Sequence, residues 1–260
     1  MSSLERSAEV FDALRQVFTC IDNTTLEGCD NRARVQTLCE RSLKLQDQSL
    51  QIGHVAAVCV YPVFVRQARQ LLSGSGIKVA SVAGAFPSGQ SPLPVKLQEI
   101  KYALDEGADE IDMVISRGSF LEGDYAKVFD EIAAIRSLVA DRTLKVILET
   151  GELQSEANIA KASEIAIEAG ADFIKTSTGK IAVSATLEAA KVMLESIKKH
   201  HDNTGKWVGF KAAGGISTPE EVLKYYQLAV SIVGKEQTTN QFFRIGASRL
   251  TDRLFSFLTE

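Results

Sequence analysis

Short apolar runs, rich in β-branched residues, alternate along the chain with longer stretches in which apolar positions recur at helical spacing. The short runs predict strands at residues 17–22, 55–61, 77–83, 109–115, 143–149, 172–177, 207–212 and 242–247. The longer stretches predict helices at residues 31–46, 62–73, 93–107, 123–139, 155–170, 184–200, 218–230 and 248–258.

This regular alternation predicts an α/β protein with a parallel sheet and helical crossovers. About eight strand–helix units in a chain of 260 residues favour one closed (β/α)₈ TIM barrel over residues 1–260, because such barrels use about 250 residues. An open doubly wound sheet is the alternative. The segment before residue 17 is expected to form an extra helix packed on the barrel.

Composition narrows the class of protein. Hydrophobic residues make up 45% of the chain and the net charge is −4, which fits a globular protein and argues against nucleic-acid binding. The N-terminal sequence MSSLERSAEV has no signal-peptide core, and no apolar run is long enough to span a membrane. We therefore expect a cytoplasmic location. The cysteines and histidines form no zinc pattern, so we expect reduced thiols and no metal.

Two segments share a motif that places ionisable residues inside apolar strands. Residues 106–114 read EGADEIDMV and residues 169–177 read AGADFIKTS, so that aligning Gly-Ala-Asp brings Asp112 onto Lys175. The recurring turn alone does not account for a carboxylate and an amine at matching strand positions. Because inward side chains in a barrel form layers from alternate strands, Asp112 and Lys175 are expected to lie in one layer.

Lys175 and Lys211 each stand near the carboxyl end of an apolar strand, in DFIKTS and WVGFKA. Active sites of barrels lie at this end of the strands. A neutral lysine amine can form an imine with a carbonyl compound, and burial together with a second cation would keep Lys175 neutral. The alternatives are a snorkelling lysine at position 175 and a phosphate-binding cation at position 211.

Three further residues are candidates beside these lysines. Asp112 is the candidate acid–base group, acting through water or Lys211, with a structural ion pair as the alternative. Asp22 ends the first predicted strand and either joins this network or caps the next turn. Cys59 is expected to be a small buried residue, since no histidine is placed by sequence to activate it.

Glycine-rich loops follow the last two predicted strands. Gly214 and Gly215 come after the seventh strand, and Gly246 with Ser248 and Arg249 follows the eighth. Barrels often bind phosphate at these loops through backbone N–H groups and a helix N-terminus. The alternative is that these are tight turns. Thr178-Gly179-Lys180 does not form a P-loop, because the flanking positions are wrong.

From about Asp22 to Ser248, the chain resembles the deoxyribose-phosphate aldolase family, and its motifs follow in the same order as in that family. KVILETGEL at 145–153, followed by KASEIAIEAGADFIKTSTGK at 161–180, is the most specific block. AVCVYP, DEIDMV, GFKAAGG and FRIGAS support the resemblance.

The resemblance implies reversible, metal-independent and cofactor-free cleavage of 2-deoxy-D-ribose 5-phosphate into acetaldehyde and D-glyceraldehyde 3-phosphate, in deoxyribonucleoside catabolism. It implies Lys175 as the Schiff-base lysine, Lys211 as the lysine that tunes it and Asp112 as the acid–base aspartate. It also implies a homodimer. The substrate-binding positions implied by the family are Asp22, Thr24, Cys59, Lys180, Gly179, Gly214, Gly215, Gly246 and Ser248.

This sequence departs from the family pattern at several positions. Ala212 stands where close relatives often have Pro, Ser217 where Arg is usual, and Arg249 where a second Ser is common. The C-terminal Tyr tail of some members is absent, since the sequence ends at Glu260. These departures keep two alternatives open: a Schiff-base aldolase with altered acceptor preference, and a non-catalytic barrel that binds sugar phosphates.

Overall fold

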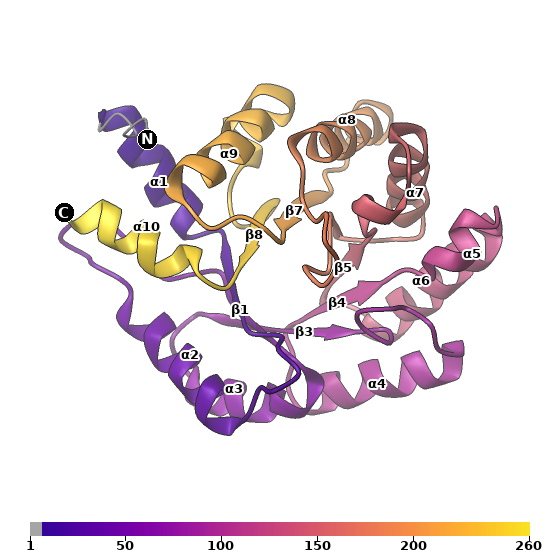
Figure 1. Ribbon diagram of the computed structural model, residues 1–260, viewed down its shortest axis with the longest axis horizontal. Coiled ribbons are helices and arrows are strands. Elements are labelled where there is room, and N and C mark those ends of the chain that lie inside the picture. Colours follow the sequence, from indigo (N-terminus) through magenta and orange to yellow (C-terminus); the bar gives the residue numbers. More distant parts are fainter. Residues whose placement is uncertain (1–6) are drawn as a thin grey trace.

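The computed structural model describes residues 7–260 and contains a closed barrel surrounded by helices (Figure 1). The barrel strands in this part of the chain are β1 (Ile21–Thr24), β2 (Ala57–Val60), β3 (Lys78–Ala83), β4 (Glu110–Val114), β5 (Thr143–Ile147), β6 (Phe173–Lys175), β7 (Gly209–Ala213) and β8 (Phe243–Ala247).

Helices fill the segments between the strands. They are α1 (Ala8–Phe18), α2 (Arg32–Lys44), α3 (Val65–Leu71), α4 (Leu93–Asp105), α5 (Arg117–Leu121), α6 (Tyr125–Val139), α7 (Glu156–Glu168), α8 (Leu187–Thr204), α9 (Pro219–Val233) and α10 (Leu250–Thr259). Single 3₁₀ turns lie at Pro62–Phe64 (η1), Thr150–Glu152 (η2) and Lys235–Gln237 (η3). None of the helices described is long and apolar enough to cross a membrane.

Every strand pairs in parallel with its neighbour, and the sheet closes between the first and last strands. Asp22 of β1 lies opposite Gly246 of β8 and opposite Ala57 of β2. A doubly wound sheet would leave two open edges, so the predicted (β/α)₈ barrel is confirmed and the open-sheet alternative is wrong.

The expected N-terminal helix is present as α1, but the first predicted strand begins too early. Val17 and Phe18 are fully buried residues of the last turn of α1, and the strand begins only at Ile21. The apolar run VFTCID spans the end of a helix and the start of a strand, and a short apolar run does not distinguish the two. Similarly, the single helix predicted over 62–73 is η1 followed by α3, and the short α5 was missed.

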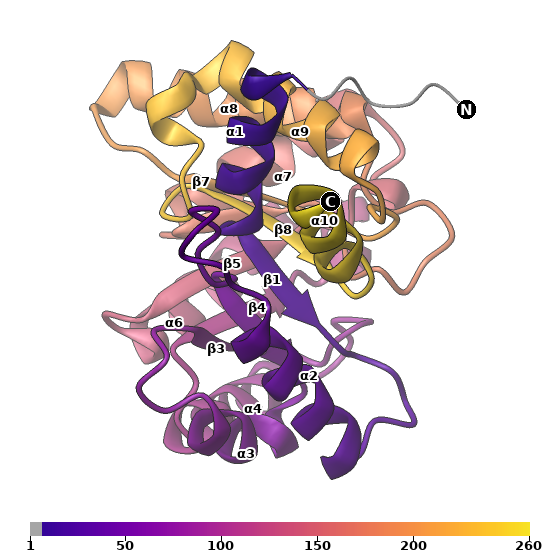
Figure 2. The same cartoon turned by 90° about the vertical axis from the view of Figure 1, so that its left-hand side faces the viewer.

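Helix α1 lies beside α9 and α10, as both ribbon views show (Figures 1 and 2). Phe11 of α1 stacks on Phe257 of α10 with ring centroids 5.5 Å apart, and Phe18 packs against Phe255. The first and last helices of the described chain therefore cover the same part of the barrel, next to the pairing of β1 and β8.

The interior of the barrel is divided between apolar and charged side chains. On β2 and β3 the inward positions are small and apolar, namely Ala57, Cys59, Ala80 and Val82, which pack together with Leu26. The inward positions of β4 to β8 instead carry lysine, arginine and carboxylate side chains. Burying charges is costly unless they are paired, so this half of the interior is where a functional site is expected.

Candidate active site

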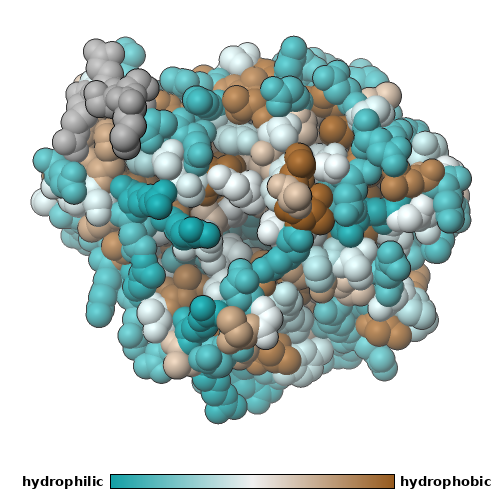
Figure 3. All heavy atoms as spheres, viewed as in Figure 1, coloured by the Kyte–Doolittle hydropathy of each residue, from teal (hydrophilic) through white to brown (hydrophobic). Residues whose placement is uncertain are grey.

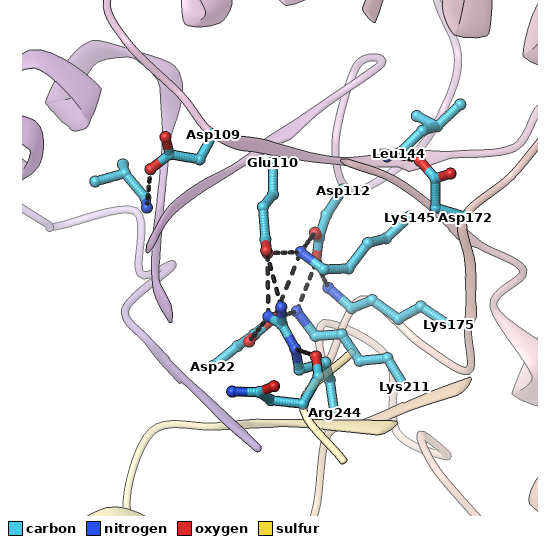
Figure 4. Close-up of polar contacts among 12 residues, drawn as sticks. Asp22, Asp109, Glu110, Asp112, Leu144, Lys145, Asp172, Lys175, Lys211 and Arg244 are labelled. Carbon is cyan, nitrogen blue, oxygen red and sulfur yellow. Dashed lines mark hydrogen bonds and ion pairs between the residues drawn. The ribbon is translucent and has the colours of Figure 1, made fainter. Parts of the chain in front are cut away.

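Charged side chains from six strands form one buried network inside the barrel (Figure 4). Each is at most 7% exposed. Within residues 7–260 the members that contact one another are Asp22 of β1, Glu110 and Asp112 of β4, Lys145 of β5, Lys175 of β6, Lys211 of β7 and Arg244 of β8.

Asp112 is the centre of the network. Its Oδ2 accepts hydrogen bonds from Nζ of Lys175 at 2.8 Å and Nζ of Lys211 at 2.7 Å. Its Oδ1 accepts one from Nζ of Lys145 at 2.8 Å. The strand register produces this convergence, because Asp112 lies opposite Lys145 and Lys175 lies opposite Lys211. The sequence-based pairing of Asp112 with Lys175 is therefore present as a direct contact.

Asp22 and Glu110 complete the network on the side away from Lys175. Arg244 donates to Oδ1 of Asp22 at 2.7 Å and to Oε1 of Glu110 at 2.9 Å. Lys211 and Lys145 donate to Asp22 and Glu110, respectively. Asp22 thus belongs to the charged network, as one of the two sequence-based interpretations proposed, and holds Lys211 from the side opposite Asp112.

The environment of Lys175 lowers the pKa of its amine. Burial is the largest effect and lowers the pKa of Lys175, and the nearby ammonium group of Lys211 lowers it further. Asp112 acts in the opposite direction but does not outweigh burial, so the pKa of Lys175 lies below its ordinary value. A lysine with a lowered pKa supplies more neutral amine near pH 7.

The other charged groups of the network stay ionised. Burial disfavours the charge on Lys145, Lys211 and Arg244, but the carboxylates outweigh it and raise each pKa. Burial likewise opposes the charge of Asp112, yet the three surrounding lysines hold its pKa well below the usual range.

The balance of charges within the network agrees with the pKa shifts of its individual members. The buried network in the described chain has three carboxylates and four basic side chains. When Lys175 is neutral, three negative groups face three positive ones. Because an unbalanced buried charge is costly, the network itself favours the form in which Lys175 has lost its proton.

A cavity of about 240 Å³ opens above Lys175 at the carboxyl ends of the strands. Its lining residues are Thr24, Leu26, Glu27, Lys175, Thr178, Gly179, Lys180, Ala213, Gly214, Gly215, Ile216, Gly246, Ala247, Ser248 and Arg249. These come from the carboxyl ends of β1, β6, β7 and β8 and from the loops that follow them, and we call this space the mouth cavity. On the face viewed in Figure 3, apolar side chains form small separate groups within a mainly polar surface.

Two glycines allow the loops to approach one another around the mouth cavity. Gly214 has φ +87°, and a Cβ there would lie 2.5 Å from Cβ of Ser184. A Cβ on Gly246 would lie 3.1 Å from Cε of Lys211 and 2.9 Å from Cβ of Ala213. A side chain at either position would displace its neighbours, so glycine is required for the loops to enclose this space.

Most residues predicted for substrate binding line the mouth cavity, but Asp22 and Cys59 are not among its lining residues. Asp22 lies deeper, in the charged network. Cys59 is fully buried among the small apolar residues of β2 and β3, and burial raises the pKa of its thiol to about 11. The interpretation of Cys59 as a small buried residue agrees with this environment. A thiol with a raised pKa is a poor nucleophile at neutral pH.

Ser217 and Arg249, which depart from the family pattern near the expected phosphate site, lie in different places. Arg249 lines the mouth cavity, whereas Ser217 is absent from the lining residues in the described chain. The N–H of Ser217 instead donates to Glu221 at 2.7 Å, and Arg253 donates to its carbonyl oxygen at 3.2 Å.

Sequence reasoning missed three members of the charged network, namely Lys145, Glu110 and Arg244. Each stands inside an apolar strand, in TLKVI, EIDMV and FRIGA. Glu110 and Asp112 are two residues apart and so point to the same face of β4. Searching every strand for charged residues on the inward face would have found all three.

A buried carboxylate also supports the loop that carries Thr178 and Lys180. Glu149 follows β5, is fully buried and has φ +58°, an unusual conformation for a residue other than glycine. Its carboxylate accepts hydrogen bonds from the backbone N–H and the hydroxyl of Thr178, at 3.0 and 2.5 Å. The N–H of Lys180 in turn donates to the hydroxyl oxygen of Thr178 at 3.1 Å.

The fold and the site together define a TIM-barrel protein with a buried lysine of lowered pKa below a polar mouth cavity. The profile of the DeoC/LacD family of aldolases matches residues 17–251, and the chain belongs to this family. It is therefore an aldolase, a carbon–carbon lyase, and the expected family resemblance is confirmed.

Similar proteins agree with this assignment. A deoxyribose-phosphate aldolase from Mus musculus is 44% identical over 250 residues, covering 91% of this chain and 78% of the relative. One from Agrobacterium fabrum is 43% identical over 249 residues, covering 95% of this chain and 92% of the relative. The tetrameric deoxyribose phosphate aldolase from Aeropyrum pernix has a similar structure, with a TM-score of 0.75 and 26% identity over 96% of this chain and 98% of that one.

Proposed function

We propose that this aldolase reversibly cleaves 2-deoxy-D-ribose 5-phosphate into acetaldehyde and D-glyceraldehyde 3-phosphate, with Lys175 forming the imine. The observation that carries the proposal is the position of Lys175, whose amine has a lowered pKa and lies below the mouth cavity within 2.8 Å of Asp112. The names of the similar proteins support this choice of substrate.

In the proposed reaction the neutral amine of Lys175 adds to the aldehyde carbon, and uptake of one proton with loss of water gives a protonated imine. A base removes the proton of the hydroxyl on the third carbon. The bond between the second and third carbons breaks, its electron pair moves into the imine to form an enamine, and glyceraldehyde 3-phosphate leaves. Protonation of the enamine carbon and hydrolysis release acetaldehyde and restore the amine.

Asp112 and Lys211 are the groups placed to serve the proton transfers. Asp112 remains ionised because its pKa is held low by Lys145, Lys175 and Lys211, so it acts as a base through a bound water or through Lys211. Lys211 bridges Asp112 and Asp22 and is held in one position by both carboxylates. It keeps a positive charge beside Lys175 while the imine forms.

The phosphate would bind at the far side of the mouth cavity. Lys180 and Arg249 supply cations, Ser248 a hydroxyl, and the glycine loops after β7 and β8 leave space for close approach to their backbone. Phosphate groups bind well where cations and backbone N–H groups converge. No metal or cofactor is required by this proposal.

The imine is tested by reduction with borohydride in the presence of acetaldehyde, followed by peptide mass mapping. Reduction adds a two-carbon group to the lysine that formed the imine. We expect the modification at Lys175 and its loss in Lys175→Met. If Lys175 is unmodified, the imine mechanism and the catalytic role of this residue are refuted.

An altered acceptor preference is the second candidate function. It is favoured by the position of Ser217, which pairs with Glu221 instead of lining the mouth cavity, and by Arg249, which does line it. Turnover of 2-deoxyribose and of its 5-phosphate separates the two candidates. We expect a strong preference for the phosphate, and equal turnover would support the altered preference.

The assembly is proposed from the family resemblance, and the location from the N-terminal sequence. We expect a homodimer in the cytoplasm that acts on the small phosphosugar and on acetaldehyde, with no nucleic-acid or membrane partner. Light scattering of the purified protein gives the mass of the assembly, and a mass of one or four chains would contradict the dimer.

A further inference from the structure

An ion pair spans the mouth cavity between two loops that are far apart in the sequence. Nζ of Lys180, after β6, lies 3.0 Å from Oε1 of Glu27, after β1. Both residues line the mouth cavity. The side chain of Lys180 is 26% exposed and that of Glu27 is 62% exposed, so the pair is reached by solvent and by ligands.

The loop that carries Glu27 is held in place by its own contacts. The N–H of Glu27 donates to Oδ2 of Asp30 at 2.9 Å, and the same carboxylate accepts from the hydroxyl of Thr25 at 2.9 Å. The hydroxyl of Tyr61 donates to the carbonyl of Leu26 at 3.3 Å. These bonds fix the backbone around Glu27, so the carboxylate is presented to the mouth cavity by a constrained loop.

The partner of Glu27 is constrained as well. The backbone of Lys180 is tied to Thr178, and Thr178 is tied to the buried carboxylate of Glu149. Both ends of the ion pair therefore project from anchored loops, and only the two side chains are free to change partner. The carboxylate of Glu27 is thus held beside Lys180, a lysine that lines the mouth cavity.

From this geometry we propose that Glu27 is a specificity-determining residue that competes with the anionic end of the substrate for Lys180. In the ligand-free enzyme Lys180 binds Glu27, and on substrate binding it releases this carboxylate and pairs with the phosphate. The inference rests on the proposed function, because it assumes that the substrate carries a phosphate into this cavity.

The size of the effect follows from the exposure of the pair. Exposed lysine–carboxylate pairs are weak, so the phosphate can displace Glu27 from Lys180. The competition with Glu27 lowers the affinity for the phosphate by about twofold to fivefold. The carboxylate also repels the phosphate directly across the cavity. Both effects are electrostatic at an accessible site, so they decrease as salt increases.

The test is the variant Glu27→Gln, which keeps the shape of the side chain and removes its charge. We expect the KM for 2-deoxyribose 5-phosphate to fall by about twofold to fivefold relative to the KM for 2-deoxyribose, and the gain to shrink at high salt. Glu164→Gln is the matched control. It removes an exposed pair with Lys199, at 2.8 Å, that joins α7 and α8 away from the mouth cavity.

Two further measurements make the outcome decisive. In a Lys180→Met background, Glu27→Gln should lose the part of its effect that acts through Lys180, which a double-mutant cycle measures. Calorimetry with inorganic phosphate should show tighter binding to Glu27→Gln than to the wild type. An unchanged KM ratio together with unchanged phosphate binding overturns the inference.

Failure of the proposed function gives a different pattern. If the wild type does not cleave 2-deoxyribose 5-phosphate, the substrate assignment is wrong, but the phosphate titration still reports whether Glu27 opposes anion binding. Tighter phosphate binding in Glu27→Gln would then support competition between Glu27 and another anionic substrate for Lys180. Equal binding would reject this competition.

Discussion

At the scale of single residues, the lowered pKa of Lys175 depends on its burial and on the charged groups around it. Among residues 7–260, Lys175 has one carboxylate contact, to Asp112, and Asp112 is shared with Lys145 and Lys211. The negative charge of Asp112 is thus shared among three lysine amines. Removing either of the other lysines would leave more of that charge acting on Lys175 and so raise its pKa.

The variant Lys211→Leu tests this dependence. Without Lys211, Asp112 acts more strongly on Lys175 and a repulsive cation is lost, so the pKa of Lys175 should rise. A base with a higher pKa is less often neutral at a given pH, and each unit reduces the neutral fraction about tenfold. We expect kcat/KM at pH 7 to fall by about tenfold or more and the rising limb of the pH–rate profile to move to higher pH.

Lys96→Met provides the control for this experiment. Lys96 is as buried as Lys211 and pairs with Glu131 at 2.9 Å, but it lies on α4, outside the barrel interior. Its loss should lower stability without moving the pH–rate profile. A profile that does not move in Lys211→Leu would contradict the proposed tuning of Lys175.

At the scale of elements, the loop after β6 is positioned by the loops after β4 and β5. Glu149 after β5 binds Thr178 after β6, and Arg117 of α5 lies 3.4 Å from the carboxylate of Glu149. Arg117 also donates to the carbonyl of Pro87 at 2.8 Å. Glu149 is therefore a positioning residue, acting on the mouth cavity through Thr178 and Lys180.

The variant Glu149→Gln should weaken this support. An amide keeps the size of the side chain but loses the charge-assisted bonds, so we expect a loss of about 1–3 kcal/mol of stability. Misplacement of the loop should raise the KM for the phosphorylated substrate several-fold and leave the borohydride trapping of acetaldehyde at Lys175 nearly unchanged. Glu152→Gln, which removes a more exposed partner of Arg117, should have a much smaller effect on KM. The role assigned to Glu149 would be untenable if the two variants behaved alike.

The sequence pattern predicted the fold and part of the site, but not every contact between residues far apart in the chain. The alternation of apolar strands and helical segments was sufficient to predict the barrel. The Gly-Ala-Asp motif shared by two segments was sufficient to predict that Asp112 lies near Lys175. The contacts of Arg244 and Lys145 were not predicted because their partners lie on other strands, up to 222 positions away in the sequence. The carboxylate of Glu149 was missed because its role depends on a loop conformation with positive φ, which the sequence pattern does not indicate.

At the scale of the whole molecule, the charged network ties the stability of the barrel to pH. The surrounding cations lower the pKa values of Asp22, Glu110 and Asp112 in the folded protein. Carboxylates with a lowered folded-state pKa stabilise the fold above their unfolded pKa of about 4, and this contribution is lost as the pH falls through the folded values.

We therefore expect the free energy of unfolding to fall steeply below about pH 4, as measured by denaturant titration across the acid range. Lys145→Met should be less stable at pH 7 by about 3–5 kcal/mol, because it leaves Glu110 and Asp112 with less compensation. It should also show a weaker dependence on acid, since the carboxylates then titrate closer to their unfolded values. An acid dependence as steep as that of the wild type would argue against the assigned electrostatics.

The position of Arg244 has a consequence for how the chain is completed during synthesis. Asp22 and Glu110 emerge from the ribosome long before β8, yet Arg244 of β8 contacts both. Until the last strand arrives, these carboxylates lack their guanidinium partner, and the nascent half-barrel has to keep them hydrated. Because β8 pairs with β1 and closes the barrel, we expect the amine of Lys175 to be less desolvated in a chain truncated before β8 than in the full chain.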